Sequence, residues 1–124
     1  SLEKSLKIPV VIGGDFNSPS HLDWIENTKE FHYGKVVEWP VSKLMLERGY
    51  TDSFREAHPD PSQTLDGTWG YFSPRDIISD RIDFVYYKSQ NLKTLTSKIV
   101  MDDPEGGFFN SDHRPVLTKF ELKN

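Results

Sequence analysis

Two polar residues that could do chemistry, Asp15 and Asn17, follow a short apolar run at Ile8–Ile12. This β-branched run predicts a buried strand that is stopped by Gly13-Gly14. Residues two apart in an extended backbone point to the same side, so a carboxylate and an amide would lie together at the strand's end. A carboxylate can position or deprotonate a water molecule, and an amide can donate to an oxygen that gains negative charge. The alternative is a simple turn, because Asp and Asn commonly bond to their own backbone in loops.

Asp83 places a carboxylate inside an otherwise apolar and aromatic segment, Arg81–Tyr87. Burying an unpaired charge is costly, so this carboxylate needs a partner or an exposed position. Periodicity alone favours a structural interpretation, either a salt bridge to Arg81 on the same face or a half-solvated strand.

A third cluster, Ser111-Asp112-His113, lies between a Gly-rich stretch and the last apolar segment. Adjacent side chains point in different directions, so these three residues do not form a Ser-His-Asp triad by themselves. The sequence also contains no Gly-x-Ser-x-Gly elbow to support such a hydrolase. An Asp-His pair in a loop is more often a local hydrogen bond than a catalytic dyad.

The segments that would position these residues include both predicted helices and predicted strands. Ser20 and Asp23 resemble an N-terminal cap and predict a short helix over His21–Lys29, and Gly49 is typical of the end of a second helix, Val41–Arg48. Further segments are expected as one helical turn, Thr51–Ala57, and as strands at Thr68–Phe72, Arg81–Tyr87, Leu92–Met101 and Pro115–Leu122, with a loop at Asp102–Asp112. This order predicts an α+β fold with a mostly antiparallel sheet flanked by helices.

The composition limits the class of protein. A chain of 124 residues with a net charge of -4 is in the single-domain range and lacks the broad cationic surface that neutralises many DNA phosphates. There is no cysteine, which excludes a disulfide framework, a thiolate nucleophile and a thiolate zinc site. No apolar run approaches the ~20 residues that span a bilayer, and Ser1–Lys7 lacks the apolar core of a signal peptide.

Taken together, the three motifs occur in a characteristic order: Gly-Asp-Phe-Asn after a strand, Arg-Ile-Asp followed by aromatics, and Ser-Asp-His before the last strand. From about Ile8 to Leu122 the chain resembles the C-terminal half of the endonuclease/exonuclease/phosphatase (DNase-I-like) superfamily. The resemblance implies an α/β sandwich and metal-assisted attack of water on phosphorus, with Mg²⁺ (or Mn²⁺) as the cofactor.

The resemblance also implies a role for each matching residue. Asp15 would position or activate the attacking water, and Asn17 would bind a phosphate oxygen. Asp112 would support the metal, and His113 would contact the phosphate as general base or charge stabiliser. Asp83 would orient His113. Trp69, just before the Arg-Ile-Asp segment, would border the phosphate as a wall of the substrate pocket.

Members of this superfamily are roughly twice as long, and their N-terminal half supplies an Asn and a Glu that hold the metal. We therefore expect residues 1–124 to form a single partial domain with little activity in isolation. The expected partners are the missing N-terminal half, a phosphoester substrate, and a second copy that would cover an exposed sheet face.

The superfamily hydrolyses nucleic acids, phosphoinositides, sphingomyelin and small phosphoesters. The negative net charge of this chain favours a small or lipid-like phosphoester over duplex DNA as the substrate. The alternative, from a different class, is a non-catalytic binding or scaffold domain that retains the fold.

Overall fold

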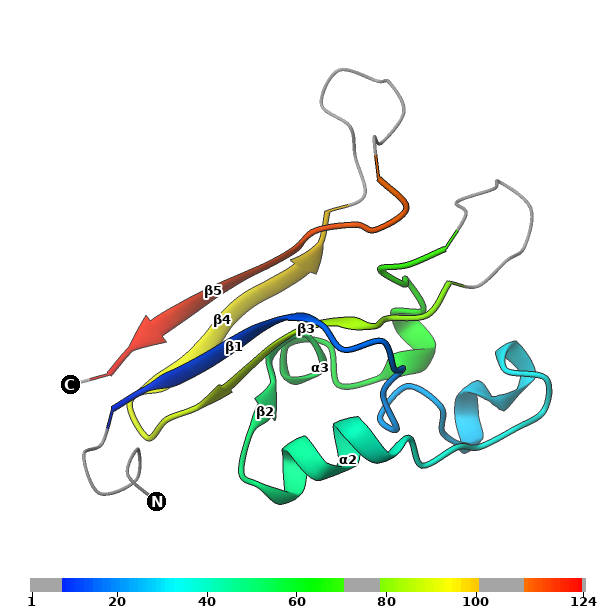
Figure 1. Ribbon diagram of the computed structural model, residues 1–124, viewed down its shortest axis with the longest axis horizontal. Helices are drawn as coiled ribbons and strands as arrows, with labels where there is room; N and C mark the ends of the chain where they lie inside the picture. The colour runs from blue at the N-terminus through cyan, green and yellow to red at the C-terminus, as the bar shows by residue number, and fades with distance from the viewer. Residues whose placement is uncertain (1–7, 71–78, 101–110, 124) are drawn as a thin grey trace.

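The computed structural model describes residues 8–70, 79–100 and 111–123. Helices and short strands alternate in the first half of the chain, and longer strands dominate the second (Figure 1). In chain order the elements are β1 (Val10–Asp15), the 3₁₀ helix η1 (Glu26–Phe31), α2 (Pro40–Glu47), β2 (Thr51–Asp52), α3 (Ser53–Ala57), the 3₁₀ helix η2 (Pro61–Gln63), β3 (Asp83–Lys88), β4 (Leu92–Ile99) and β5 (Val116–Leu122).

The strands form two antiparallel groups. One is a three-stranded sheet in the order β1-β3-β2, and the other is the pair β4-β5. In Figure 1 the β1 and β3 ribbons lie between the β4-β5 pair and α2. The predicted α+β class with antiparallel pairing is therefore confirmed for the described residues.

The core is built around β3, the central strand of its sheet. Phe84 and Tyr86 are 2% and 0% exposed, and the ring of Phe16 packs edge-on against both. Tyr87 is also buried, and its ring packs at an angle on Phe120 of β5. The Tyr87–Phe120 contact links the two groups of strands, and the other aromatic contacts pack the segment after β1 against β3.

The first strand is shifted from the predicted Ile8–Ile12, because β1 starts at Val10 and continues through Gly13 and Gly14 to Asp15. Both glycines pair with β3, opposite Val85 and Phe84. Pairing with a central strand therefore overrides the low strand propensity of glycine here. The consequence for the site is that Asp15 is the last residue of a strand rather than part of a loop.

The predicted helix at His21–Lys29 is wrong in both position and type. The chain makes turns up to Ile25 and then forms η1 at Glu26–Phe31. Side chains explain the difference: Ser20 Oγ accepts from the Leu22 amide, and the Thr28 hydroxyl donates to the Asp23 carbonyl. Such local bonds compete with helical ones.

The other elements follow the sequence more closely. Helix α2 starts at Pro40, a residue favoured in the first turn, and is followed by Gly49 at φ +87°, as expected for a helix end. In the predicted strand Thr68–Phe72, Trp69 forms isolated bridges to Asp80 and His113, and residues 71–72 lie outside the described part. The same holds for Met101 and for residues 102–110 of the predicted loop. Among the described helices, none has the length and apolar character needed to cross a membrane.

Candidate active site

Two carboxylates meet at one end of the β1-β3 pair. The antiparallel register ends with Asp15 of β1 directly opposite Asp83 of β3. The Gly-Asp-Phe-Asn motif contributes Asp15 and the Arg-Ile-Asp motif contributes Asp83. Strand pairing alone therefore brings together two residues that are almost 70 positions apart in the sequence. The expectation that Asp15 lies at the end of a strand is confirmed.

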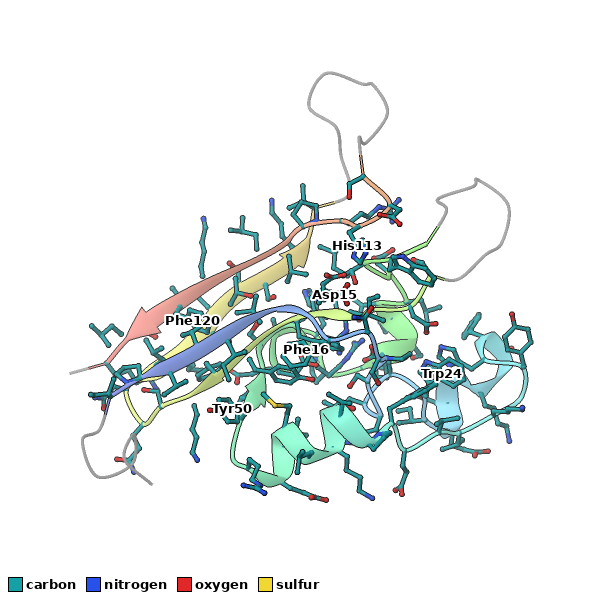
Figure 2. All side chains as sticks on the ribbon, in the orientation of Figure 1. Asp15, Phe16, Trp24, Tyr50, His113 and Phe120 are labelled. Carbon is teal, nitrogen blue, oxygen red and sulfur yellow. The ribbon has the colours of Figure 1, made fainter. Side chains whose placement is uncertain are left out.

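His113 completes the group from a third segment, just before β5. Its Nδ1 lies 2.8 Å from Asp83 Oδ2, and its Nε2 lies 3.9 Å from Asp15 Oδ2. An ionised carboxylate can only accept, so Nδ1 carries the hydrogen and donates it to Asp83. Figure 2 shows the labelled Asp15 and His113 side chains near each other where β1 ends. The Asp83–His113 contact that the resemblance implied is therefore present, and it fixes the orientation of the imidazole.

The surrounding acids raise the pKa of His113 above its ordinary value. The hydrogen bond to Asp83 is the largest cause, and the negative charges of Asp83, Asp112 and Asp15 act in the same direction. The His113 side chain keeps about a third of its surface exposed, so solvent can reach the imidazole. The protonated form is therefore more stable than in an isolated histidine, at a position that solvent reaches.

The extended backbone expected from Asp15 to Asn17 does not form, because the strand ends before Asn17. The Asn17 backbone is left-handed, at φ 51°, and its backbone N–H donates to Asp15 Oδ1 at 2.8 Å. The turn interpretation of this motif is thus realised, because Asp15 does bond to the backbone two residues later. The turn and a chemical role are compatible, since the other oxygen of Asp15 still faces His113.

Trp69 and Asp112 border the group without joining it. Trp69 bridges to His113 through the backbone and leaves 46% of its surface exposed. The carbonyl of Asp112 accepts from the Gly70 amide, and its exposed carboxylate acts on His113 through its charge. In the described part of the chain, the group of three or more acidic or histidine residues whose ligand atoms all lie within 4.8 Å of one another is Asp15, Asp83 and His113.

The alternative partner for Asp83, a salt bridge to Arg81, is wrong. Arg81 is 3% exposed and turns inward, where it donates to both oxygens of Asp23 and both oxygens of Asp52. Arg55 donates to the same Asp23 carboxylate. These four side chains, Asp23, Asp52, Arg55 and Arg81, form the buried charge cluster.

The buried charge cluster was not foreseen from the sequence. Its only signal is an Arg at the start of an apolar strand, because the acidic partners, Asp23 and Asp52, lie far from Arg81 in the sequence. A cavity of about 20 Å³ adjoins it, which is room for one water molecule. This cavity is lined by Asp23, Arg55 and Arg81 among others, not by the Asp15, Asp83 and His113 group, which lies open at the surface.

Two other residues near the motifs face away from the group. The Trp24 indole donates to Asp80 Oδ1 and stacks on the His32 ring at 4.1 Å. His21 Nδ1 lies 2.8 Å from Ser42 Oγ. Both side chains therefore hold the loop after β1 against its neighbours.

The mixture of helices and antiparallel strands is consistent with the fold of a family of nuclease- and phosphatase-type hydrolases. The chain belongs to the Endonuclease/Exonuclease/phosphatase family, whose model matches residues 2–113.

Two curated relatives are similar to the chain. An uncharacterized protein of Caenorhabditis elegans is 43% identical over 97 residues, which cover 70% of this chain and 30% of that protein. The CCR4-Not complex 3'-5'-exoribonuclease subunit Ccr4 of Kluyveromyces lactis is 31% identical over 127 residues, which cover 94% of this chain and 16% of that protein. The chain thus spans less than a third of the length of these relatives.

Proposed function

We propose that this chain carries the side of a divalent-metal-dependent phosphoesterase centre that positions the water, binds the phosphate and supplies the histidine. The observation that carries the proposal is the convergence of Asp15, Asp83 and His113 from three separate segments. A solvent-facing imidazole held by one carboxylate and faced by a second is suited to charge stabilisation next to a general base.

The geometry favours different roles for the two groups that face a substrate. Because Asp83 accepts from Nδ1 and this hydrogen bond raises the pKa of His113, a proton on Nε2 is held more readily than in a free imidazole, and Nε2 would donate it in a hydrogen bond to a phosphate oxygen. Asp15 would then take the proton of the attacking water. A new bond forms between the water oxygen and phosphorus, the bond to the leaving oxygen breaks, and that oxygen takes a proton from solvent. Of the two roles that the resemblance left open for His113, the raised pKa supports charge stabilisation.

The donor set suits a hard cation. The Asp15 carboxylate is an oxygen ligand of the type that Mg²⁺ or Mn²⁺ takes together with water, whereas Asp112, the metal ligand that the resemblance implies, lies outside the group of Asp15, Asp83 and His113. Asp83 is less available because its carboxylate already accepts from His113. A bound divalent cation would polarise the phosphoryl oxygen and neutralise developing charge.

Asp15→Ala and His113→Ala test this function in the complete gene product that contains the chain. We expect either change to lower Mg²⁺-dependent hydrolysis of a generic phosphodiester by about 10²- to 10⁴-fold, as for loss of a general acid or base. Glu47→Ala, an exposed carboxylate on α2, is the matched control and should leave the rate unchanged. Activity that survives both site changes would refute the assignment. An inactive wild-type protein that still binds a phosphoester would support the non-catalytic alternative.

The substrate class is a separate proposal. The net charge of -4 supports a small or lipid-like phosphoester, whereas the relative described as a 3'-5'-exoribonuclease supports RNA. Steady-state rates on single-stranded RNA, duplex DNA and a small phosphodiester would decide among them. Duplex DNA as the best of the three would contradict the charge argument.

We also propose that the chain functions together with further protein surface. Apolar side chains on three strands are 44–66% exposed and could contact further protein surface: Val11 at 49%, Leu95 at 57%, Leu117 at 44% and Leu122 at 66%. An N-terminal half like that of other family members would cover them and supply metal ligands, and a second copy would provide cover alone. Light scattering that shows a stable monomer of residues 1–124 at high concentration would contradict the second arrangement.

A further inference from the structure

A short segment, Gly67–Gly70, lies between the two strand regions that carry Asp83 and His113. On one side the amides of Thr68 and Trp69 both donate to the carbonyl of Asp80, at 3.0 and 3.1 Å. On the other side the Gly70 amide donates to the carbonyl of Asp112. The segment therefore bridges the backbones on either side of the Asp83–His113 hydrogen bond.

Thr68 makes the most direct of these links. Its side-chain oxygen accepts from the backbone amides of Ile82 and Asp83, both at 3.0 Å. Its carbonyl accepts from the Arg114 amide at 2.7 Å. One residue thus bonds to the backbone of Asp83 itself and to that of the residue following His113.

The burial of Thr68 makes these bonds hard to replace. Thr68 is 0% exposed and Ile82 is 7% exposed, so water has little access to the Ile82 amide if the hydroxyl is removed. A buried amide that loses its acceptor costs more than an exposed one, and the backbone tends to move to find another.

The preceding residue leaves the segment little room to shift. A Cβ at Gly67 would lie 2.1 Å from the carbonyl oxygen of Ser79, a distance that no side chain tolerates. Only glycine allows this close approach of two backbones, which places Thr68 within reach of Ile82 and Asp83.

We propose that Thr68 is a positioning residue, whose hydroxyl and carbonyl together set the placement of Asp83 against His113. This inference rests on the proposed function of the site. Thr68 does not touch the reacting atoms; it acts through the backbone of Asp83 on one side and of Arg114 on the other. A displacement of about 1 Å at a catalytic pair can cost about 10²-fold in rate, so this link has a measurable effect.

The test compares Thr68→Val with Thr68→Ser in the complete gene product. Valine keeps the shape and removes the acceptor, whereas serine keeps the acceptor and removes a methyl group. With Mg²⁺ and a small phosphodiester, we expect Thr68→Val to lower kcat by about 10- to 100-fold with little change in KM. Thr68→Ser should restore most of the rate. Thr96→Val, an exposed threonine on β4, is the matched control.

Two NMR measurements report on positioning without relying on activity. We expect Thr68→Val, but not Thr68→Ser, to speed hydrogen exchange of the Ile82 and Asp83 amides by about tenfold or more. The same variant should shift the ¹⁵N resonance of His113 Nδ1, because its hydrogen bond to Asp83 is altered. If Thr68→Val does not fold, Thr68→Ala removes the same acceptor.

The outcomes separate this inference from the proposed function. A wild-type kcat in Thr68→Val, or a lowered kcat with an unchanged His113 resonance, overturns the positioning role. If the wild-type protein hydrolyses no phosphoester but the amide and imidazole signals change as expected, the proposed function fails and the positioning of His113 by Thr68 is supported.

Discussion

Replacing Arg81 by methionine should destabilise the protein more than any surface charge change. The guanidinium makes four hydrogen bonds of 2.6–2.9 Å, two to Asp23 and two to Asp52. The side chains of Arg81 and Asp52 are each 2% exposed, and that of Asp23 is 14% exposed. Methionine fills similar space but leaves Asp52 without its charged partner.

The expected magnitude follows from what each acid retains. Asp23 keeps its ion pair with Arg55, whereas Asp52 keeps only a 3.3 Å bond from the Arg55 amide. Removing one partner of a buried pair costs about 3–5 kcal/mol, because the remaining charge is left unsolvated. Arg81→Lys should also lose stability, since one ammonium cannot bind two carboxylates through a planar fork. The double change Arg81→Met with Asp52→Asn should recover part of the loss.

Urea unfolding followed by tryptophan fluorescence measures the change. The matched control is Lys43→Met, which breaks the exposed 3.0 Å pair with Glu38 and should cost less than about 1 kcal/mol. If Arg81→Met costs no more than this control, the buried charge cluster does not stabilise the fold and the reasoning is wrong.

The pH dependence gives a second check on Arg81→Met. Burial alone would raise the pKa of Asp23, but the charges and hydrogen bonds of Arg81, then of Arg55, outweigh burial and lower it below 3.8. A carboxyl group with a lowered pKa contributes stability above its unfolded pKa and loses it as the pH falls. The stability difference between wild type and Arg81→Met should therefore be largest near neutral pH and should shrink as the pH falls through 4. A difference that grows on acidification would contradict the ion-pair origin.

Three further predictions address other parts of the structure. Asp83→Asn should lower the pKa of His113, because it removes the largest cause of the raised value; an NMR titration that shows no decrease would refute this. Gly67→Ala should cost about 1–3 kcal/mol in unfolding free energy, because the added methyl group meets the facing backbone, and a neutral effect would show that the approach is looser. Tyr87→Phe should cost about 1 kcal/mol by urea unfolding, because its hydroxyl donates to the exposed Glu56 at 2.6 Å in a part-buried bond; no loss would mean that the bond contributes nothing.

Local sequence signals predicted the elements whose stability is local. Gly49 marks the end of α2, and the apolar Asp83–Lys88 segment forms the buried central strand. The helix expected at His21–Lys29 failed because its polar side chains bond to the nearby backbone, which a cap pattern alone does not reveal.

The sequence motifs predicted three residues of the candidate site. Asp15, Asp83 and His113 each followed from a motif, and the structure brings all three together. Thr68 and Asp23 were not predictable, because their importance depends on contacts with segments 14 and 58 residues away. A buried threonine hydroxyl and a loop aspartate carry no distinctive local pattern.

Two charged residues near the start of β3, two positions apart, belong to different parts of the structure: one to the buried charge cluster and one to the candidate site. Arg81 turns into the protein to meet Asp23 and Asp52, whereas Asp83 turns to His113 at the surface. Neither charge could be placed here without its partner, and both sets of partners come from other parts of the chain. The ion pairs that stabilise the fold and the hydrogen bond that orients the imidazole are therefore separated by a single residue, Ile82.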